Sequence, residues 1–406
     1  MQKDCITIAL DVPALQVEAQ RSEHGALLIQ VRYRAMSRPC PRCGQLTSHV
    51  HQYHRQLKCH IPVWGQRVLL ELRKRRFRCP GCRKVFMEPD EVCGWRRRST
   101  RAFRWAMAEA CRIATVKAVA ARAGVSEALV QRALNEMCPE MLQDMVQAPT
   151  VLALDELWIG AKAGCVTLLY APEEHWVLDL GPGRTQVKAE TLLCGPAQRA
   201  QIKAVVIDMA EAYRQAVRYA CPGARIVADK FHVLARLLRA VTKVVSRVQR
   251  TAERTDQRAL RHRRLFTAPE GALSELQRRE RDRLLRVYPA LAQAWEIAQA
   301  FRTIYQAADR EQAARALDAW WTRVRKEGPR EFLGLRYMLT HWREEILNYF
   351  TYRVTNAFAE GKNNRIKAII RAGYGYRNIA NLTQRIMLTN PLTSTTGEAL
   401  SPHFLT

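Results

Sequence analysis

The chain has 406 residues, with 65 Lys and Arg against 38 Asp and Glu, and its formal net charge at pH 7 is +27. Hydrophobic residues make up 48% of the sequence, which is too many for a disordered polyelectrolyte and enough for several packed cores. The length allows two to four domains. A surplus of basic charge this large points to a polyanionic partner, because Lys and Arg attract phosphates.

The positive charge is unevenly distributed along the chain. Residues 1–150 carry 25 Lys and Arg against 13 Asp and Glu, residues 151–230 carry nine of each, and residues 231–345 carry 24 against 14. A neutral segment between basic ones suits a protein that grips nucleic acid and keeps its carboxylates for another task. General solubility and binding to a membrane surface are the alternative explanations of the charge.

Targeting signals are not expected. The first 20 residues contain Asp4, Asp11 and Glu18 and lack the apolar core of a secretory signal. No stretch of about 18 apolar residues occurs, so a membrane-spanning segment is not predicted. Twelve cysteines in such a chain favour reduced thiols and metal ligands over disulfides, which indicates a cytoplasmic protein without a membrane partner.

Two cysteine pairs, Cys40 with Cys43 and Cys79 with Cys82, each enclose two residues. Two such turns can aim four thiolates at one tetrahedral ion, so the sequence predicts a structural Zn²⁺ site within residues 1–95. The separation of the pairs exceeds that of the commonest zinc ribbons and leaves room for a hairpin, with a strand over 68–78. Substitute ligands in the region are His49, His51, His54, Cys59, His60 and Cys93.

Residues 72–78 combine Arg and Lys with Phe77, and we expect Arg75 and Arg76 to contact phosphates. A solvated strand face is the alternative.

Residues 116–137 have the pattern of a helix-turn-helix within a domain of residues 96–148. Gly124 permits a positive-φ turn, Ser126 can cap the second helix, and Val130 and Leu134 fall on its inner face. The second helix of this motif enters the major groove, so the exposed side chains Gln131, Arg132 and Asn135 are predicted to contact bases. Many helical hairpins share the pattern without binding DNA. Pro139 is expected to end the helix, and residues 147–150 to form a linker.

From residue 151 the pattern is that of an α/β domain. Predicted strands over 151–157, 165–170 and 175–180 are followed by a helix at 185–193, a strand at 204–208, a helix at 211–219 and a strand at 225–228. This is the element order of the ribonuclease-H-like fold, in which the first and fourth strands are neighbours. Residues 231–345 are then predicted to be helical, with aromatic residues that form a core more readily than a base-stacking surface.

Three carboxylates have settings that suit phosphodiester chemistry. Asp155 closes the apolar run 151–154 of the first strand, Asp208 closes the apolar run 204–207 of the fourth, and Glu360 lies in a predicted helix. Two divalent cations about 3.5–4 Å apart can stabilise the attacking and leaving oxygens of a phosphoryl displacement, and carboxylate ligands favour Mg²⁺ or Mn²⁺. For each residue alone, an acid that merely ends a strand or faces solvent is the alternative.

The helix that carries Glu360 has further polar residues on the same face. They follow at helical spacing and are predicted to contact DNA: Asn363, Asn364, Lys367 and Arg371. An ordinary amphipathic surface helix is the alternative.

Together, these motifs resemble a known family. The blocks at 154–156, 206–209, 228–232, 355–367 and 372–378, with the cysteine pairs and the helix-turn-helix, are similar to DDE-type insertion-sequence transposases of the ISL3 family. The resemblance implies an α/β ribonuclease-H-like core (149–230 and 346–390) interrupted by an all-α insertion (231–345). A zinc ribbon (1–95) and a helix-turn-helix domain (96–148) precede the core, and a tail (391–406) follows it.

The resemblance also implies that Asp155, Asp208 and Glu360 are the Asp-Asp-Glu triad. The expected protein binds the terminal inverted repeats of its element in double-stranded DNA, and then cleaves strands and transfers a 3′-OH to target DNA. It would use Mg²⁺ or Mn²⁺ at the triad and structural Zn²⁺, and act as a homodimer or larger synaptic complex at a prokaryotic nucleoid. Glu156, Asp229 and His232 are expected near the triad in supporting roles.

Three alternatives remain open. One is a transposase-derived DNA-binding regulator with an inactive core, another is a ribonuclease-H-like nuclease without strand transfer, and the third is a structural nucleoid protein.

Overall fold

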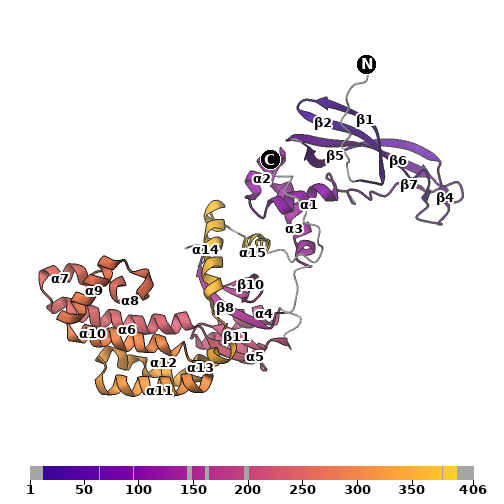
Figure 1. The fold of residues 1–406 in the computed structure, drawn as a ribbon. Coiled ribbons are helices and arrows are strands. Elements are labelled where there is room, and N and C mark those ends of the chain that lie inside the picture. Colours follow the sequence, from indigo (N-terminus) through magenta and orange to yellow (C-terminus); the bar gives the residue numbers. More distant parts are fainter. Residues whose placement is uncertain are drawn as a thin grey trace. The chain divides into compact units, whose positions relative to one another are not determined.

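The structure is a computed structural model that describes residues 12–63, 65–94, 96–143, 149–160, 164–195, 201–376 and 378–390. The predicted tail at 391–406 and residues 147 and 148 of the predicted linker at 147–150 lie outside these residues. The chain divides into two compact units, residues 1–145 and 146–406, which are described separately (Figure 1). Within the described ranges, no helix has both the length and the apolar character needed to cross a membrane.

The first unit is built on a sheet in the order β1-β2-β6-β5, with β7 on the far part of β6. Apolar side chains alternate along β2 and β6 and form the core, including Val31, Val68 and Leu70. The long β5–β6 hairpin occupies the stretch between the two cysteine pairs, as the sequence predicted. The strands are β1 (Leu15–Glu23), β2 (Ala26–Tyr33), β3 (Arg38–Pro39), β4 (Leu46–Thr47), β5 (Val50–Val63), β6 (Gln66–Arg78) and β7 (Val85–Met87).

Three helices complete this unit: α1 (Arg101–Ala110), α2 (Val116–Ala123) and α3 (Glu127–Gln143). Gly124 ends α2 with φ +63°, and the Ser126 hydroxyl accepts the Leu129 N–H at 3.3 Å, so both turn predictions are confirmed. The predicted end of the helix at Pro139 is wrong, because α3 continues to Gln143. Cys138 and Met141 stay buried across this point, and a proline removes only one helical N–H donor.

The second unit contains a five-stranded sheet in the order β10-β9-β8-β11-β12 (Figure 1). The first three strands are antiparallel, and β8, β11 and β12 are parallel, so the expected pairing of the first and fourth strands is found. All residues of β11 are buried, because elements cover both faces of the sheet. The strands are β8 (Val151–Trp158), β9 (Cys165–Ala171), β10 (Trp176–Pro182), β11 (Ala204–Ile207) and β12 (Arg225–Ala228).

Helices α4 (Gln186–Cys194) and α5 (Glu211–Ala220) follow strands of this sheet, and α14 (Ala357–Ala372) and α15 (Ile379–Met387) return to it. Between them lies the helical region that begins with α6. Its main helices are α6 (Lys230–Thr251), α7 (Arg254–Leu260), α8 (Arg264–Thr267), α9 (Glu275–Val287), α10 (Pro289–Ile304), α11 (Arg310–Glu327), α12 (Arg336–His341) and α13 (Arg343–Tyr352).

One hydrophobic core runs from the sheet into these helices without a break. Val233 and Leu237 of α6 belong to it together with Val206 of β11. Within the helical region, the rings of Phe301 and Trp320 are buried and pack edge to face with centroids 4.8 Å apart. These two aromatic residues therefore form core, as the sequence predicted.

Candidate active site and zinc site

The four predicted zinc ligands come together. One ligand atom from each of Cys40, Cys43, Cys79 and Cys82 lies within 4.8 Å of all the others. The two turns have the same backbone pattern, since Gly44 N–H donates to the Cys40 carbonyl at 2.9 Å and Arg83 N–H donates to the Cys79 carbonyl at 3.0 Å. Four thiols that converge from two rigid turns fit a closed tetrahedral Zn²⁺ site.

The substitute ligands considered for this site are placed differently. His60 is buried, and its Nδ1 lies 2.9 Å from the Thr100 hydroxyl. Cys93 is buried beside Asp90, which accepts its backbone N–H at 3.0 Å. Among the residues that the structure describes, the cluster that could hold an ion in this unit consists of the four paired cysteines.

The two arginines predicted to contact phosphates differ in exposure. Arg75 is buried, and its guanidinium donates to Glu88 Oε2 at 2.7 Å and to the Ala35 carbonyl at 2.6 Å. It therefore neutralises an internal carboxylate and does not face solvent. Arg76, the next residue along β6, is exposed. The surface of this hairpin that can meet a phosphate includes Arg76 and excludes Arg75.

The predicted base-contacting residues lie on the outer side of α3. Arg132 and Asn135 are exposed, and Gln131 is half-buried and donates to the Asn135 side chain at 2.8 Å. Val130 and Leu134 are buried on the inner side. The division of this helix between core and surface is as predicted.

In the second unit, three carboxylates lie side by side at the carboxyl-terminal end of the pairing between the parallel strands. Val206 pairs with Ala153 and Ile207 pairs with Ala228, so continuing this register sets Asp208 beside Asp155 on one side and Asp229 on the other. Neighbouring strands lie about 4.8 Å apart. The sheet therefore gathers Asp155 and Asp208, as the strand order predicted, and adds Asp229.

Asp155 is held by two hydrogen bonds. Its Oδ1 accepts the Glu156 N–H at 2.8 Å, and its Oδ2 accepts from Asn363 Nδ2 of α14 at 2.8 Å. Burial raises the pKa of the Asp155 carboxyl, while these two donors and the nearby His232 oppose the rise. Each oxygen keeps a lone pair free, because a carboxylate oxygen can accept two bonds.

Asp208 follows β11 and has a less satisfied environment. Its Oδ1 is buried and has no hydrogen-bond partner among the residues that the structure describes. Burial, with repulsion from Glu156 and Asp155, raises the pKa of the Asp208 carboxyl to about 6. A buried oxygen without a donor is costly in an isolated chain and is explained if a cation is its partner.

Asp229 connects three elements and is buried. Its Oδ2 lies 2.9 Å from His232 Nδ1, and its Oδ1 accepts the Asn356 N–H at the start of α14. The Asn356 side chain in turn donates to the Leu154 carbonyl at 3.3 Å. The hydrogen bond to Asp229 is the main cause that raises the pKa of His232, and Asp208 and Asp155 add to it. Asp229 thus ties α6, α14 and β8 together beside the other acids.

Glu156 occupies the next position of β8 and is half-buried. One of its oxygens lies 3.7 Å from the exposed Arg184 guanidinium. Its charge is the second cause, after burial, of the raised pKa of Asp208.

Glu360 is exposed on α14, one helical turn before Asn363. Side chains at this spacing start about 5–6 Å apart, and Asn363 touches Asp155. Within the described ranges, the three predicted triad acids do not form a cluster as tight as the four cysteines. The structure therefore pairs Asp155 with Asp208 and brings the helix of Glu360 to them, with the glutamate side chain in solvent.

The remaining polar residues of this helix divide in the same way. Asn364, Lys367 and Arg371 are exposed, whereas Asn363 faces the sheet. Two partners in this region were not singled out from sequence: Tyr170, which binds Asn363, and Asn356, which binds Asp229. The available signal for Tyr170 was a phenol in an otherwise apolar strand, since a buried phenol requires a hydrogen-bond partner.

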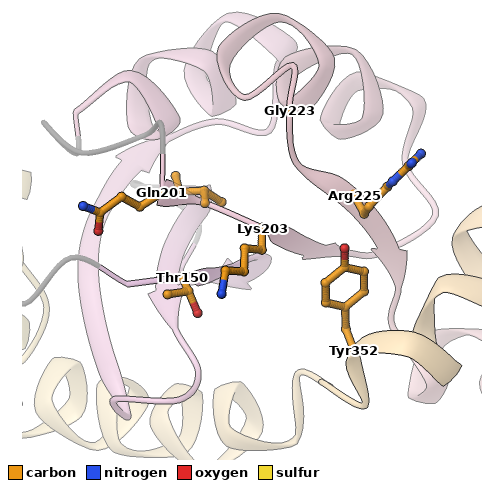
Figure 2. A pocket seen from close by; sticks show the side chains of 7 residues that line it. Thr150, Gln201, Lys203, Gly223, Arg225 and Tyr352 are labelled. Carbon is orange, nitrogen blue, oxygen red and sulfur yellow. The ribbon is translucent and has the colours of Figure 1, made fainter.

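A hollow lies at the opposite edge of the sheet, where the parallel strands begin (Figure 2). Thr150, Lys203 and Arg225 stand at the starts of β8, β11 and β12, and Tyr352 of α13 faces them. The acids lie at the other end of these strands. The hollow is therefore not part of the carboxylate site.

Comparison with known proteins agrees with this arrangement. The family of DDE transposases of the ISL3 type matches residues 152–386, and the zinc finger of the transposases of IS204, IS1001, IS1096 and IS1165 matches residues 37–82. The transposase for insertion sequence element IS1001 from Bordetella parapertussis is 28% identical over 352 residues, which is 84% of this chain and 85% of that protein. The first match spans more than half of the chain and includes the sheet, the helical region and α14, and we conclude that the chain belongs to the ISL3 family of DDE transposases.

Proposed function

We propose that the protein binds the terminal inverted repeats of its own insertion sequence, cleaves DNA strands there and transfers the freed 3′-OH to target DNA. The observation that carries the proposal is the parallel register of β8 and β11, which when continued sets Asp208 beside Asp155, in a chain that belongs to a transposase family. The sheet order β10-β9-β8-β11-β12 supports a ribonuclease-H-like core.

The donor set of the site fits Mg²⁺ or Mn²⁺. It consists of carboxylate oxygens, and the buried Asp208 Oδ1 lacks any other partner. We assign Asp155, Asp208 and Glu360 as the residues that would hold the ions. When bound, such ions activate a hydroxyl nucleophile and neutralise charge on the phosphorus oxygens. The residues of the chain supply the fixed carboxylates, the sheet edge that orients them, and a helix, α14, with exposed Asn364, Lys367 and Arg371 for the DNA strand.

The first test uses a plasmid that carries the insertion sequence with its native ends. Wild-type protein with Mg²⁺ is expected to nick at the ends and to yield joined product, whereas Asp155→Asn and Glu360→Gln lose both and still retard end DNA in a gel. Cleavage retained by either variant would contradict the triad. Cleavage without joined product would instead identify a nuclease, and binding without cleavage by the wild type would identify a regulator.

The DNA-binding surfaces of the first unit can be separated by a second prediction. Arg132→Ala on α3 should weaken binding to end DNA about 5–100-fold and reduce its preference over unrelated DNA, because a base contact is worth roughly 1–3 kcal/mol. Arg76→Ala on the hairpin should weaken binding to both DNAs equally and lower the salt slope by about 1. Titrations at several salt concentrations measure both effects. Equal loss on both DNAs for Arg132→Ala would exclude base readout by that residue.

A further inference from the structure

Two hydrogen bonds in series link the buried Tyr170 of the sheet to the Asp155 carboxylate. The Tyr170 hydroxyl on β9 donates to Asn363 Oδ1 at 2.6 Å, and Asn363 Nδ2 donates to Asp155 Oδ2 at 2.8 Å. Tyr170 is fully buried and pairs with Ala153, two residues before Asp155 on β8. The asparagine therefore bridges a rigid strand and a carboxylate with one side-chain amide.

The direction of the amide follows from its two partners. The Tyr170 phenol is protonated at neutral pH and can donate, and burial raises its pKa further. The carbonyl oxygen of Asn363 accepts a hydrogen bond from that hydroxyl, so its NH₂ group is left to face Asp155. The reversed amide would set an oxygen against the carboxylate and lose the bond to Asp155, whereas the Tyr170 hydroxyl could still accept from the NH₂ group.

The same helix is anchored at two further points. Phe358 of α14 packs edge to face on Tyr170, with ring centroids 6.2 Å apart, and stacks on His175 at 4.8 Å. At the start of the helix, Asn356 is bound to Asp229 and to the Leu154 carbonyl. These contacts fix the rotation of α14, and with it the position from which Glu360 projects.

We infer that Asn363 is a positioning residue for the metal-binding carboxylate Asp155, and that Tyr170 acts through it by holding the amide in place. This rests on the proposed function of the carboxylate site. It replaces the expectation that Asn363 contacts DNA, because its amide oxygen and nitrogen are both engaged inside the protein. Its neighbour Asn364 is exposed and stays available for that role.

The test measures two quantities on the full-length chain. One is the Mg²⁺ concentration that gives half-maximal cleavage of end DNA, and the other is the rise in unfolding temperature of the second unit caused by Mn²⁺ without DNA. Asn363→Ala should lower the cleavage rate, or raise the Mg²⁺ concentration needed for half-maximal cleavage, by about 10–100-fold. Losses of this size are typical when a residue that orients a metal ligand is removed. The Mn²⁺-induced rise should shrink with it, because binding to the folded state is weaker.

Tyr170→Phe removes one hydroxyl and should act in the same direction with a smaller effect, roughly 3–10-fold. If Tyr170 works only through Asn363, the double variant should match Asn363→Ala, since coupled residues are not additive. Asn364→Ala is the matched control for the manganese measurement, and should leave the temperature rise at its wild-type value.

Asp155→Asn distinguishes a failure of the positioning role of Asn363 from a failure of the proposed function of the carboxylate site. If it abolishes cleavage and the manganese effect while Asn363→Ala keeps wild-type Mg²⁺ demand and temperature rise, the positioning role is refuted and the site stands. Additive effects of Tyr170→Phe and Asn363→Ala would refute the relay through the amide. If Asp155→Asn itself cleaves normally, the proposed function fails and this inference fails with it.

Discussion

Asp208→Asn should reduce DNA cleavage by roughly 10³-fold or more and, at the same time, stabilise the second unit at pH 8 in the absence of Mg²⁺ and Mn²⁺. The loss follows if the carboxylate holds a metal ion whose charge stabilisation of the transition state is worth several kcal/mol. The gain follows because the folded protein keeps this carboxyl buried, with one oxygen unpartnered and a pKa raised to about 6.

The stability of the second unit depends on pH through the Asp208 carboxyl. A carboxyl whose folded pKa lies above its unfolded value stabilises the fold below about pH 4, and that contribution is lost as pH rises through about 6. At pH 8 the wild type therefore carries a penalty on the order of 1–3 kcal/mol that a neutral asparagine lacks. Urea unfolding at pH 5 and pH 8 measures it, and the difference between variant and wild type should be larger at pH 8.

Asp179→Asn is a suitable control. Asp179 lies in β10 of the same sheet, and burial also raises its pKa, but it is not among the carboxylates of the site. Its replacement should stabilise the unit in the same direction and leave cleavage intact. Normal cleavage by Asp208→Asn, or a loss of stability at pH 8, would contradict the assignment of Asp208 as a metal ligand held at a cost to the fold.

Cys79→Ser should release the structural zinc and abolish binding to end DNA, with affinity lower by about 100-fold or more. Binding of a structural zinc ion is worth about 10–16 kcal/mol in small zinc domains, more than a marginally stable domain can lose. Cys79 is buried, and it directly follows β6, the strand of the hairpin that carries Arg76. Zinc content per chain and gel retardation measure the two effects.

The second unit should be unaffected by that change, because the described residues of its hydrophobic core, from Val151 to Ile386, all come from the second unit itself. Its unfolding transition should stay within a degree or two of the wild type. Cys59→Ser is the control, since Cys59 is half-buried and lies outside the four-cysteine cluster. A variant at Cys79 that keeps one zinc ion per chain would show that another residue completes the site.

The strands themselves could be predicted because they depend on local pattern, and the pairing of two acids followed from the element order, which is that of a fold in which the first and fourth strands are neighbours. Residues 151–154 and 204–207 are buried throughout. Because the two strands are parallel, the acids that follow these runs lie at the same carboxyl-terminal end of the pairing. The zinc ligands were predictable for a similar reason, since two short turns each fix their own pair of thiols.

Other features depend on partners that no local pattern specifies. The basic run around Arg75 indicates an exposed charge, whereas in the structure its guanidinium donates to Glu88, thirteen residues away. Asn363 lies 193 residues from Tyr170 and 208 residues from Asp155, and its spacing alone could not distinguish a DNA contact from an internal bridge. The continuation of α3 past Pro139 is decided by packing of Met141, which outweighs the lost backbone bond.

The uninterrupted core between the sheet and the helices has a practical consequence for engineering. The segment from α6 to α13 cannot be cut out or exchanged as a cassette, because Val233 and Leu237 fill the same interior as the strands. A shortened version would leave apolar surface uncovered next to Asp229, where α6 begins. A shortened derivative of this protein would therefore also need new residues on the face of the sheet that these helices cover.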